Sequence, residues 1–221
     1  MKKNTKENLF EISKTLLFGI LAGASISLGC IANLSSGSKI AGALFFVIGL
    51  YLVLVFNFNL FTGKVCYSLE QKPSYIAKLA LIWLGNLCGA IIMAELVKLT
   101  RISTLQATNE AIVNAKLGDN FLSLFVLGIF CNALIYVAVH GFNNFDNPLK
   151  QTLALFFGVS VFVLCGFEHC VADMFYFAFA GSYTFDTLLR LLVITAGNIV
   201  GGLALPTIFL LTNKPKREKQ S

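Results

Sequence analysis

Long apolar runs without a charged side chain alternate with short polar segments along most of the chain. A helix needs about 20 apolar residues to cross the hydrocarbon core of a bilayer. Six runs approach or reach that length, at residues 15–38, 40–63, 79–94, 120–139, 151–167 and 191–213. Residues 75–77 and 96–97 can lengthen the third run, and the fifth continues to Tyr183. The pattern predicts an all-α integral membrane protein with six transmembrane helices.

The composition agrees with a membrane protein. Of 221 residues, 57% are hydrophobic and 13% are charged, whereas soluble domains are about half apolar and about a quarter charged. The formal net charge of +6 therefore belongs to loops and tails. The basic residues form no stripe with interleaved aromatic side chains, so a nucleic-acid partner is not expected.

The basic residues also predict the orientation, because Lys and Arg are retained on the cytoplasmic side of a membrane. An even number of spans places both tails on one side. That side carries eleven basic residues, which are Lys2, Lys3, Lys6, Lys14, Lys72, Lys78, Lys150, Lys214, Lys216, Arg217 and Lys219. The other side carries five, which are Lys39, Lys98, Arg101, Lys116 and Arg190. We therefore predict a multi-pass protein of the cell inner (plasma) membrane with both termini cytoplasmic and a short tail at 214–221.

Two short motifs indicate that the chain consists of two related halves. "GNLCGA" at 85–90 and "GNIVGG" at 197–202 both read Gly-Asn-x-x-Gly followed by a small residue. Asn86 follows Gly19 by 67 residues, and Asn198 follows Gly128 by 70 residues. Because each half has an odd number of spans, the halves must cross the membrane in opposite senses. The sequence thus predicts one channel domain over 1–221, with inverted repeat halves at about 10–100 and 119–213.

Polar residues interrupt the second span of each half. "FNFNLFTGKVCYSL" at 56–69 breaks one apolar run, and "CGFEHCVADMFYF" at 165–177 breaks the other. Non-helical backbone at membrane depth is tolerated only where protein or a wet cavity covers it. Gly63 and Gly166 supply the backbone freedom that a turn needs. The second and fifth helices are therefore predicted to be broken, with a site at the point where the breaks meet.

Ionisable residues in the second break favour a transport pathway. Glu168, His169 and Asp173 lie in an apolar run, where such groups are costly and usually functional. His169 has an ordinary pKa near neutrality, so it can transfer a proton during transport. It can equally be a buried neutral imidazole that bridges the two breaks. Both interpretations of His169 stay open.

Other classes of protein fit the residues less well. An aquaporin-like channel for neutral solutes needs Asn-Pro-Ala at its breaks, and neither break contains Pro. An intramembrane enzyme needs a serine nucleophile or paired aspartates. Asp173 has no acidic partner in the apolar runs beyond Glu168, so no enzymatic activity is expected. A metal- or proton-coupled transporter is supported only by Cys165, His169, Cys170 and Asp173. These are too few ligands for a metal site, and no cofactor is expected.

Three motifs together resemble the formate/nitrite transporter family over essentially the whole chain. They are "LFTG" at 60–63, "GFEHCVADM" at 166–174 and "GNIVGG" at 197–202. The resemblance implies a homopentamer of aquaporin-like protomers in the lipid bilayer. Each protomer would have its own pore for a small monovalent anion or its conjugate acid, such as formate, nitrite or hydrosulfide.

The same resemblance assigns residues to the pore. Its centre would hold Thr62, His169, Glu168 and Asn198. One constriction would consist of Leu50, Leu60 and Phe61, and the other of Phe46 and Phe162. Lys150 and Asn132 would form a polar pair that favours anion entry.

Two residues depart from the family's formate channels. Asn59 stands where those channels carry an acid, and Asp173 stands where Asn is usual. Asn59 followed by "TGK" at 62–64 is similar to the branch that conducts hydrosulfide. The resemblance therefore leaves the identity of the anion open.

Overall fold

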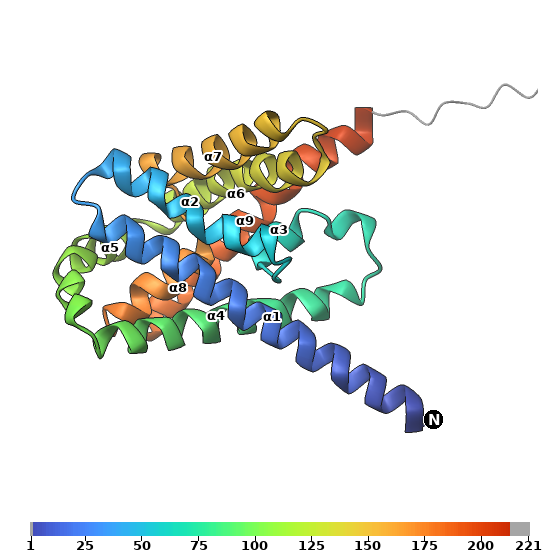
Figure 1. Ribbon diagram of the computed structural model, residues 1–221, viewed down its shortest axis with the longest axis horizontal. Coiled ribbons are helices and arrows are strands. Elements are labelled where there is room, and N and C mark those ends of the chain that lie inside the picture. Colours follow the sequence, from blue (N-terminus) through green and yellow to red (C-terminus); the bar gives the residue numbers. More distant parts are fainter. Residues whose placement is uncertain (1, 213–221) are drawn as a thin grey trace, which may run out of the picture.

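The computed structural model describes residues 2–212, and every regular element in that range is a helix (Figure 1). In chain order the α-helices are α1 (Lys2–Ser35), α2 (Lys39–Val55), α3 (Phe61–Val65), α4 (Tyr75–Lys98), α5 (Gln106–Gly118), α6 (Phe121–Asn144), α7 (Pro148–Cys165), α8 (Cys170–Phe179) and α9 (Phe185–Thr212). The 3₁₀ turns are η1 (Ser68–Glu70) and η2 (Arg101–Leu105). The predicted tail at 214–221 lies outside the described residues.

Five of these helices are long and apolar enough to cross a membrane. They are α4, α6, α7, α9 and the Glu7–Ser35 part of α1. The apolar helices α2, with 17 residues, and α8, with 10 residues, are shorter. The predicted all-helical architecture is confirmed, whereas the count of six spans stays a prediction.

Both predicted breaks are present. Helix α2 ends at Val55 and α3 begins at Phe61, while α7 ends at Cys165 and α8 begins at Cys170. Gly166 has a left-handed backbone with φ of 71°, as a helix C-cap requires. The turn residue of the first break is Asn57, with φ of 51°, and Gly63 lies inside α3. The expectation that Gly63 supplies this turn was wrong, because the chain has already resumed its helix there.

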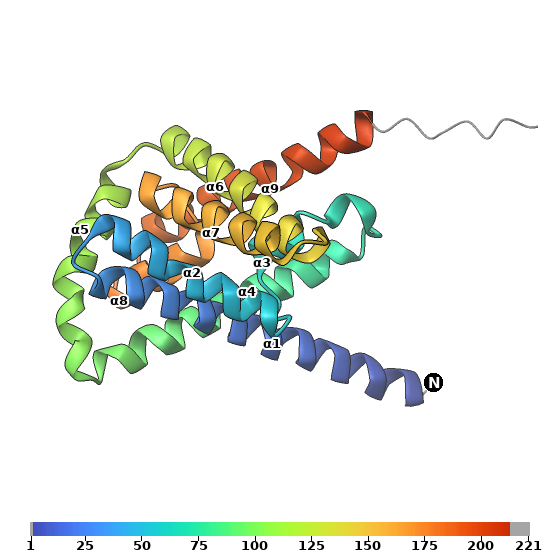
Figure 2. The same cartoon turned by 45° about the horizontal axis from the view of Figure 1, so that its top comes forward.

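Two groups of helices enclose the short ones. Figures 1 and 2 show α6 and α7 along one side and α1 and α4 along the other, with α3 and α8 between them. Helix α1 packs on α4 as α6 packs on α9, so the two halves repeat one arrangement. The N-terminal end of α1 projects away from this body (Figure 1). All ten residues of α8 are buried, which places this half-helix at the centre of the protein.

Matched glycines allow the two long pairs to touch. A Cβ atom on Gly89 of α4 would lie 2.0 Å from the carbonyl oxygen of Ile20 on α1. A Cβ atom on Gly201 of α9 would lie 2.1 Å from the carbonyl oxygen of Ile129 on α6. Small residues at such contacts are typical of membrane helices, where close van der Waals packing drives association. These two glycines occupy the same place in the two repeated motifs.

Candidate functional site

A hydrogen bond joins the two broken helices at the centre of the protein. The Thr62 hydroxyl oxygen and His169 Nε2 lie 2.9 Å apart, and both residues are buried. His169 is also the N-cap of α8, where its Nδ1 accepts a hydrogen bond from the Ala172 amide at 3.2 Å. Because Nδ1 acts as an acceptor, the proton of the neutral ring lies on Nε2. The ring therefore donates to Thr62 Oγ1.

Two aromatic rings cover this pair. The Phe162 ring stacks on the imidazole of His169, with centroids 5.6 Å apart and planes 16° apart. The Phe46 ring packs edge-on against Phe162 at 5.6 Å. The structure thus brings Phe46 and Phe162, the two residues of one predicted constriction, together, with Phe162 in contact with the central histidine.

Asn198 fixes the backbone of the second break. Its side-chain oxygen accepts a hydrogen bond from the Cys170 amide at 2.9 Å. Its Nδ2 donates to the carbonyl oxygens of Gly128 at 2.9 Å and Glu168 at 2.8 Å. Since these three bonds occupy the amide, Asn198 holds the loop that carries His169.

Asn86 does the same for the first break. Its oxygen accepts from the Phe61 amide at 2.9 Å, and its Nδ2 donates to Gly19 at 2.8 Å and Asn59 at 2.9 Å. In both halves the bonded residues are the first of the half-helix and the one two positions before it. Sequence reasoning did not include Asn86 in the site. The signal was nevertheless present, because the matched Gly-to-Asn spacings correspond to these two hydrogen bonds.

Asn132 connects α3 to α9. Its Nδ2 donates to the carbonyl oxygens of Thr62 at 3.2 Å and Asn198 at 2.7 Å. The side-chain oxygen has no hydrogen-bond partner among the described residues. Lys150 is exposed in the first turn of α7, and it is not among the described residues that line the cavities below. The structure therefore does not place Lys150 in the site with Asn132.

The buried cation beside the centre is Lys116. Its Nζ contacts Glu168 Oε2 and lies 2.8 Å from Asp173 Oδ1. Burial alone would lower the pKa of Lys116, but the carboxylates of Asp173 and Glu168 raise it above the ordinary lysine value. Sequence reasoning placed Lys116 only among the loop lysines. The signal was its position on one face of α5 with Asn109 and Val113, which are also buried.

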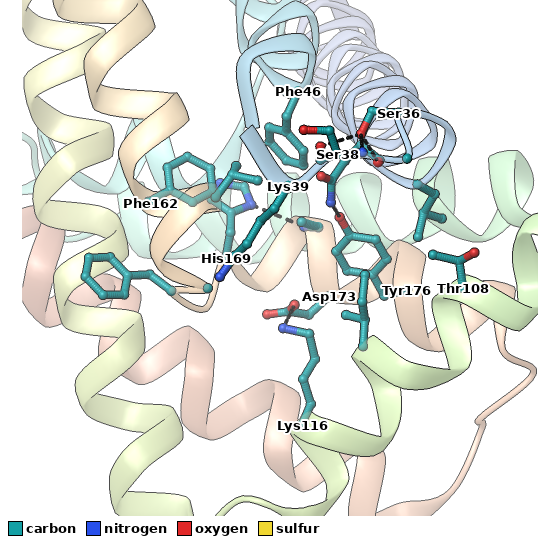
Figure 3. A pocket seen from close by; sticks show the side chains of 18 residues that line it. Ser36, Ser38, Lys39, Phe46, Thr108, Lys116, Phe162, His169, Asp173 and Tyr176 are labelled. Carbon is teal, nitrogen blue, oxygen red and sulfur yellow. Dashed lines mark hydrogen bonds and ion pairs between the residues drawn. The ribbon is translucent and has the colours of Figure 1, made fainter. Parts of the chain in front are cut away.

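Two cavities are lined by residues of the broken helices. The first, which we call the α5 cavity, has a volume of about 470 Å³ (Figure 3). Its lining includes Lys39, Phe46, Lys116, Phe162, His169 and Asp173. The second, which we call the α3 cavity, has a volume of about 80 Å³. Its lining includes Leu50, Leu60, Gly63, Lys64 and Val139.

Helix α2 lines both cavities at successive levels. Phe46 faces the α5 cavity, whereas Leu50 and Leu54, further along the helix, face the α3 cavity. Of the predicted constriction of Leu50, Leu60 and Phe61, Leu50 and Leu60 line the α3 cavity, whereas Phe61 is buried and is not among the described residues that line it. The two cavities are therefore separated by the apolar side chains of the two predicted constrictions and by the Thr62–His169 hydrogen bond.

Comparisons with known sequences agree on one family. A family model described as "Formate/nitrite transporter" matches residues 1–212. The chain is 30% identical over 212 residues to the uncharacterized transporter YrhG of Bacillus subtilis (strain 168), covering 85% of this chain and 80% of that protein. It is 31% identical over 214 residues to the formate channel BtFdhC of Bacillus thuringiensis, covering 85% and 82%.

Solved structures share the fold. A pentameric formate channel with formate bound superposes with a TM-score of 0.75 at 25% identity, covering 91% of this chain and 96% of that chain. An FNT family ion channel superposes with a TM-score of 0.80 at 24% identity, covering 96% and 93%. The second likeness concerns the fold alone.

Proposed function

Because the chain belongs to the formate/nitrite transporter family, as its motifs predicted, we propose that it is a membrane channel for small monovalent anions of weak acids and not an enzyme. The observation that carries the proposal is the Thr62–His169 hydrogen bond, which joins two broken helices at the end of the α5 cavity. A hydroxyl and a ring N–H at this point offer hydrogen bonds to a small polar solute. The surrounding Phe and Leu side chains offer none.

The apolar side chains of the two constrictions determine whether a substrate passes as the anion or as its neutral conjugate acid. A bare anion loses its hydration between Phe46, Phe162, Leu50 and Leu60, and this loss costs many kcal/mol in a low dielectric. The neutral conjugate acid loses far less. We propose that the anion enters the α5 cavity, takes a proton there, and passes the rings as the acid.

His169 acts in this scheme as a hydrogen-bond donor. Its Nδ1 accepts from the Ala172 amide, so a second proton on the ring would break the cap of α8. This geometry supports a neutral ring that donates through Nε2 to Thr62 or to the passing acid. The proton on the substrate then comes from water in the cavity, and the hydroxide that remains exchanges with the solution outside the cavity.

We propose formate as the first substrate, ahead of nitrite and hydrosulfide. A relative of 31% identity is a formate channel. The argument for hydrosulfide depended on Asn59, which stands near Thr62 at a position where the family's formate channels carry an acidic residue. The Asn59 side chain instead donates to the Thr15 carbonyl of α1 at 3.3 Å, so it faces a neighbouring helix and not the cavities.

We propose that the channel is a homopentamer in the plasma membrane with both termini cytoplasmic. A structure of a pentameric formate channel covers 91% of this chain, which supports the assembly. Large apolar side chains that are exposed in the single chain, such as Phe45 and Phe157, suit lipid or a neighbouring subunit. In this orientation the α5 cavity opens to the outside of the cell.

Uptake into proteoliposomes tests the proposed function. We expect formate to enter faster than chloride at equal concentration, because chloride has no weak conjugate acid at the pH of the assay. Nitrite, hydrosulfide and lactate complete the comparison, and protein-free liposomes provide the baseline. Chloride flux equal to formate flux would contradict the weak-acid mechanism, and baseline rates for all five solutes would contradict the channel.

A further inference from the structure

A third cavity, which we call the α9 cavity, lies between η1, α6 and α9 and has a volume of about 360 Å³. Its lining includes Cys66, Tyr67, Glu70, Tyr136, His140 and Phe209. Among the described residues it shares Tyr67 with the α3 cavity and none with the α5 cavity. The Thr62–His169 site therefore does not account for the side chains that gather here.

Aromatic rings form much of the wall of the α9 cavity. The centroid of the Tyr136 ring lies 6.4 Å from that of Tyr67 and 6.5 Å from that of Phe209. The imidazole of His140 stacks on Tyr136 at 5.1 Å. The faces of Tyr and Phe rings attract cations, because the ring quadrupole places negative charge there. The His140 ring does not oppose a cation, since its Nδ1 accepts from Asn144 Nδ2 at 3.3 Å and the ring is therefore neutral.

Glu70 adds a negative charge to these rings. It is the last residue of η1, it is exposed, and it lines the cavity. Among residues 7–212, whose side chains the structure describes, Glu70 forms no ion pair. A primary ammonium group carries three N–H donors, and a carboxylate and the hydroxyl of a Tyr can accept them. Aromatic faces, a free carboxylate and the hydroxyls of Tyr67 and Tyr136 together suit a primary ammonium group.

The surroundings of the cavity indicate that this ammonium group belongs to a lipid. Phe209 and Leu210 line the cavity from the C-terminal end of α9, and they are 46% and 57% exposed. Because α9 is long and apolar enough to cross a membrane, these side chains offer contact to acyl chains beside the cavity. Figure 1 shows the end of α9 at the same end of the molecule as the start of α1, which is the cytoplasmic end in the proposed orientation.

We propose that the α9 cavity binds the head group of a phospholipid that ends in a primary ammonium, from the cytoplasmic leaflet. The ammonium contacts Glu70 and the aromatic rings, and the acyl chains lie along the exposed end of α9. Cys66, which lines the cavity, is the C-cap of α3, and its thiol donates to the Thr62 carbonyl at 3.2 Å. A bound head group therefore supports the half-helix that carries Thr62.

The test measures binding of two lipids that differ in the ammonium group. Delipidated protein is mixed with phosphatidylethanolamine and phosphatidylcholine of identical acyl chains, and native mass spectrometry counts the retained lipids. We expect the unmodified protein to bind phosphatidylethanolamine about three- to ten-fold more tightly, because a quaternary ammonium cannot donate to a carboxylate.

Three variants locate the site. Glu70→Gln should abolish most of this preference. Phe209→Leu keeps an apolar side chain but removes a ring, so we expect it to weaken binding of phosphatidylethanolamine about two- to five-fold. Glu11→Gln is the matched control, because Glu11 is an exposed carboxylate of α1 that is not among the described residues lining the cavity.

Thermal unfolding in nanodiscs provides a second measurement. A ligand that binds only the folded state stabilises it. Phosphatidylethanolamine should therefore raise the unfolding temperature relative to phosphatidylcholine, and Glu70→Gln should remove most of the difference.

The outcomes do not depend on transport. Equal binding of the two lipids, or a preference that Glu70→Gln retains, would overturn the site even if formate flux is normal. Phosphoethanolamine, which has no acyl chains, should not displace the lipid at equal concentration. If it does, the cavity binds a soluble amine and the assignment to a lipid is wrong.

Discussion

The His169 ring combines two hydrogen bonds, one that caps α8 and one that reaches Thr62. Asn is a good N-cap, so His169→Asn should keep the helix start and the fold. The variant loses the ring that stacks on Phe162, and we expect formate flux to fall about ten-fold, the rate effect of about 1.4 kcal/mol. If the ring stays neutral, the curve of flux against pH keeps its shape at lower height. An inflection near neutral pH that disappears in the variant would show instead that His169 titrates.

Lys116 forms ion pairs with two buried acidic side chains, and its removal tests the cluster. Breaking a buried ion pair by deleting one partner costs about 3–5 kcal/mol, so Lys116→Met should unfold at markedly lower temperature in detergent. Because the pKa of Lys116 is raised, its stabilising contribution is complete below the ordinary lysine value of 10.5 and is lost only as pH rises through the raised value. Thermal unfolding at several pH values between neutral and strongly alkaline measures this loss.

A triple variant is the control for that result. Lys116→Met with Glu168→Gln and Asp173→Asn leaves no buried charge unpaired, so most of the lost stability should return. If the triple variant is no more stable than Lys116→Met, the ion cluster does not stabilise the fold.

At the residue scale, Lys150 and Lys116 illustrate what the sequence alone could not predict about the site. Lys150 was expected to attract anions, and the structure leaves it exposed at the start of α7. Lys116 lies 52 residues from Glu168, in a segment with no transmembrane character, so no local pattern connects the two. Only the fold of α5 over the breaks brings them together, whereas the Thr62–His169 pair came from motifs that lie in the breaks themselves.

At the scale of the helices, Asn86 and Asn198 hold the two breaks in the same way. Replacing either by Leu leaves a buried backbone amide and the carbonyl group two positions before it without their side-chain partner, at about 1–3 kcal/mol for each unsatisfied group. We expect Asn86→Leu and Asn198→Leu to lower the unfolding temperature by similar amounts and to reduce flux together. Asn114→Leu, at an exposed position of α5, is the matched control. A large effect in only one half would contradict the equivalence of the two clamps.

The sequence predicted the positions of both breaks, but not the residue that makes the turn of the first. Apolar runs interrupted by polar residues located both breaks, because unpaired backbone at membrane depth needs polar partners. The turn of the first break was assigned to Gly63, although the left-handed residue is Asn57. Asn adopts this conformation more readily than most residues, so glycine alone is an incomplete guide to such turns.

At the scale of the whole molecule, the relation between the two halves was readable because both carry the same contact, whereas their inverted orientation stays a prediction. The Gly-to-Asn spacings of 67 and 70 residues correspond to the hydrogen bonds Asn86–Gly19 and Asn198–Gly128. The assembly was not readable in this way, since apolar faces suit lipid and protein partners equally. The pentamer was therefore expected from family resemblance and stays a proposal.

A bulky substitution at Gly63 tests whether each subunit has its own pore. Gly63 lines the α3 cavity, and a Cβ atom there would meet only Val139, at 3.5 Å. The ring of Gly63→Phe should therefore extend into this cavity of about 80 Å³ and block it without displacing backbone. Gly118→Phe is the control, because Gly118 lies at the end of α5 with open space around its Cβ position. Native mass spectrometry of the purified variants reports whether the assembly is kept.

Mixed assemblies of unmodified and Gly63→Phe subunits then distinguish two designs. With one pore in each subunit, formate flux should fall in proportion to the fraction of blocked subunits. With one pore shared by all subunits, a single ring would block the assembly, and flux would fall much more steeply. Since Thr62, His169 and both cavities lie within one chain, we expect the proportional fall.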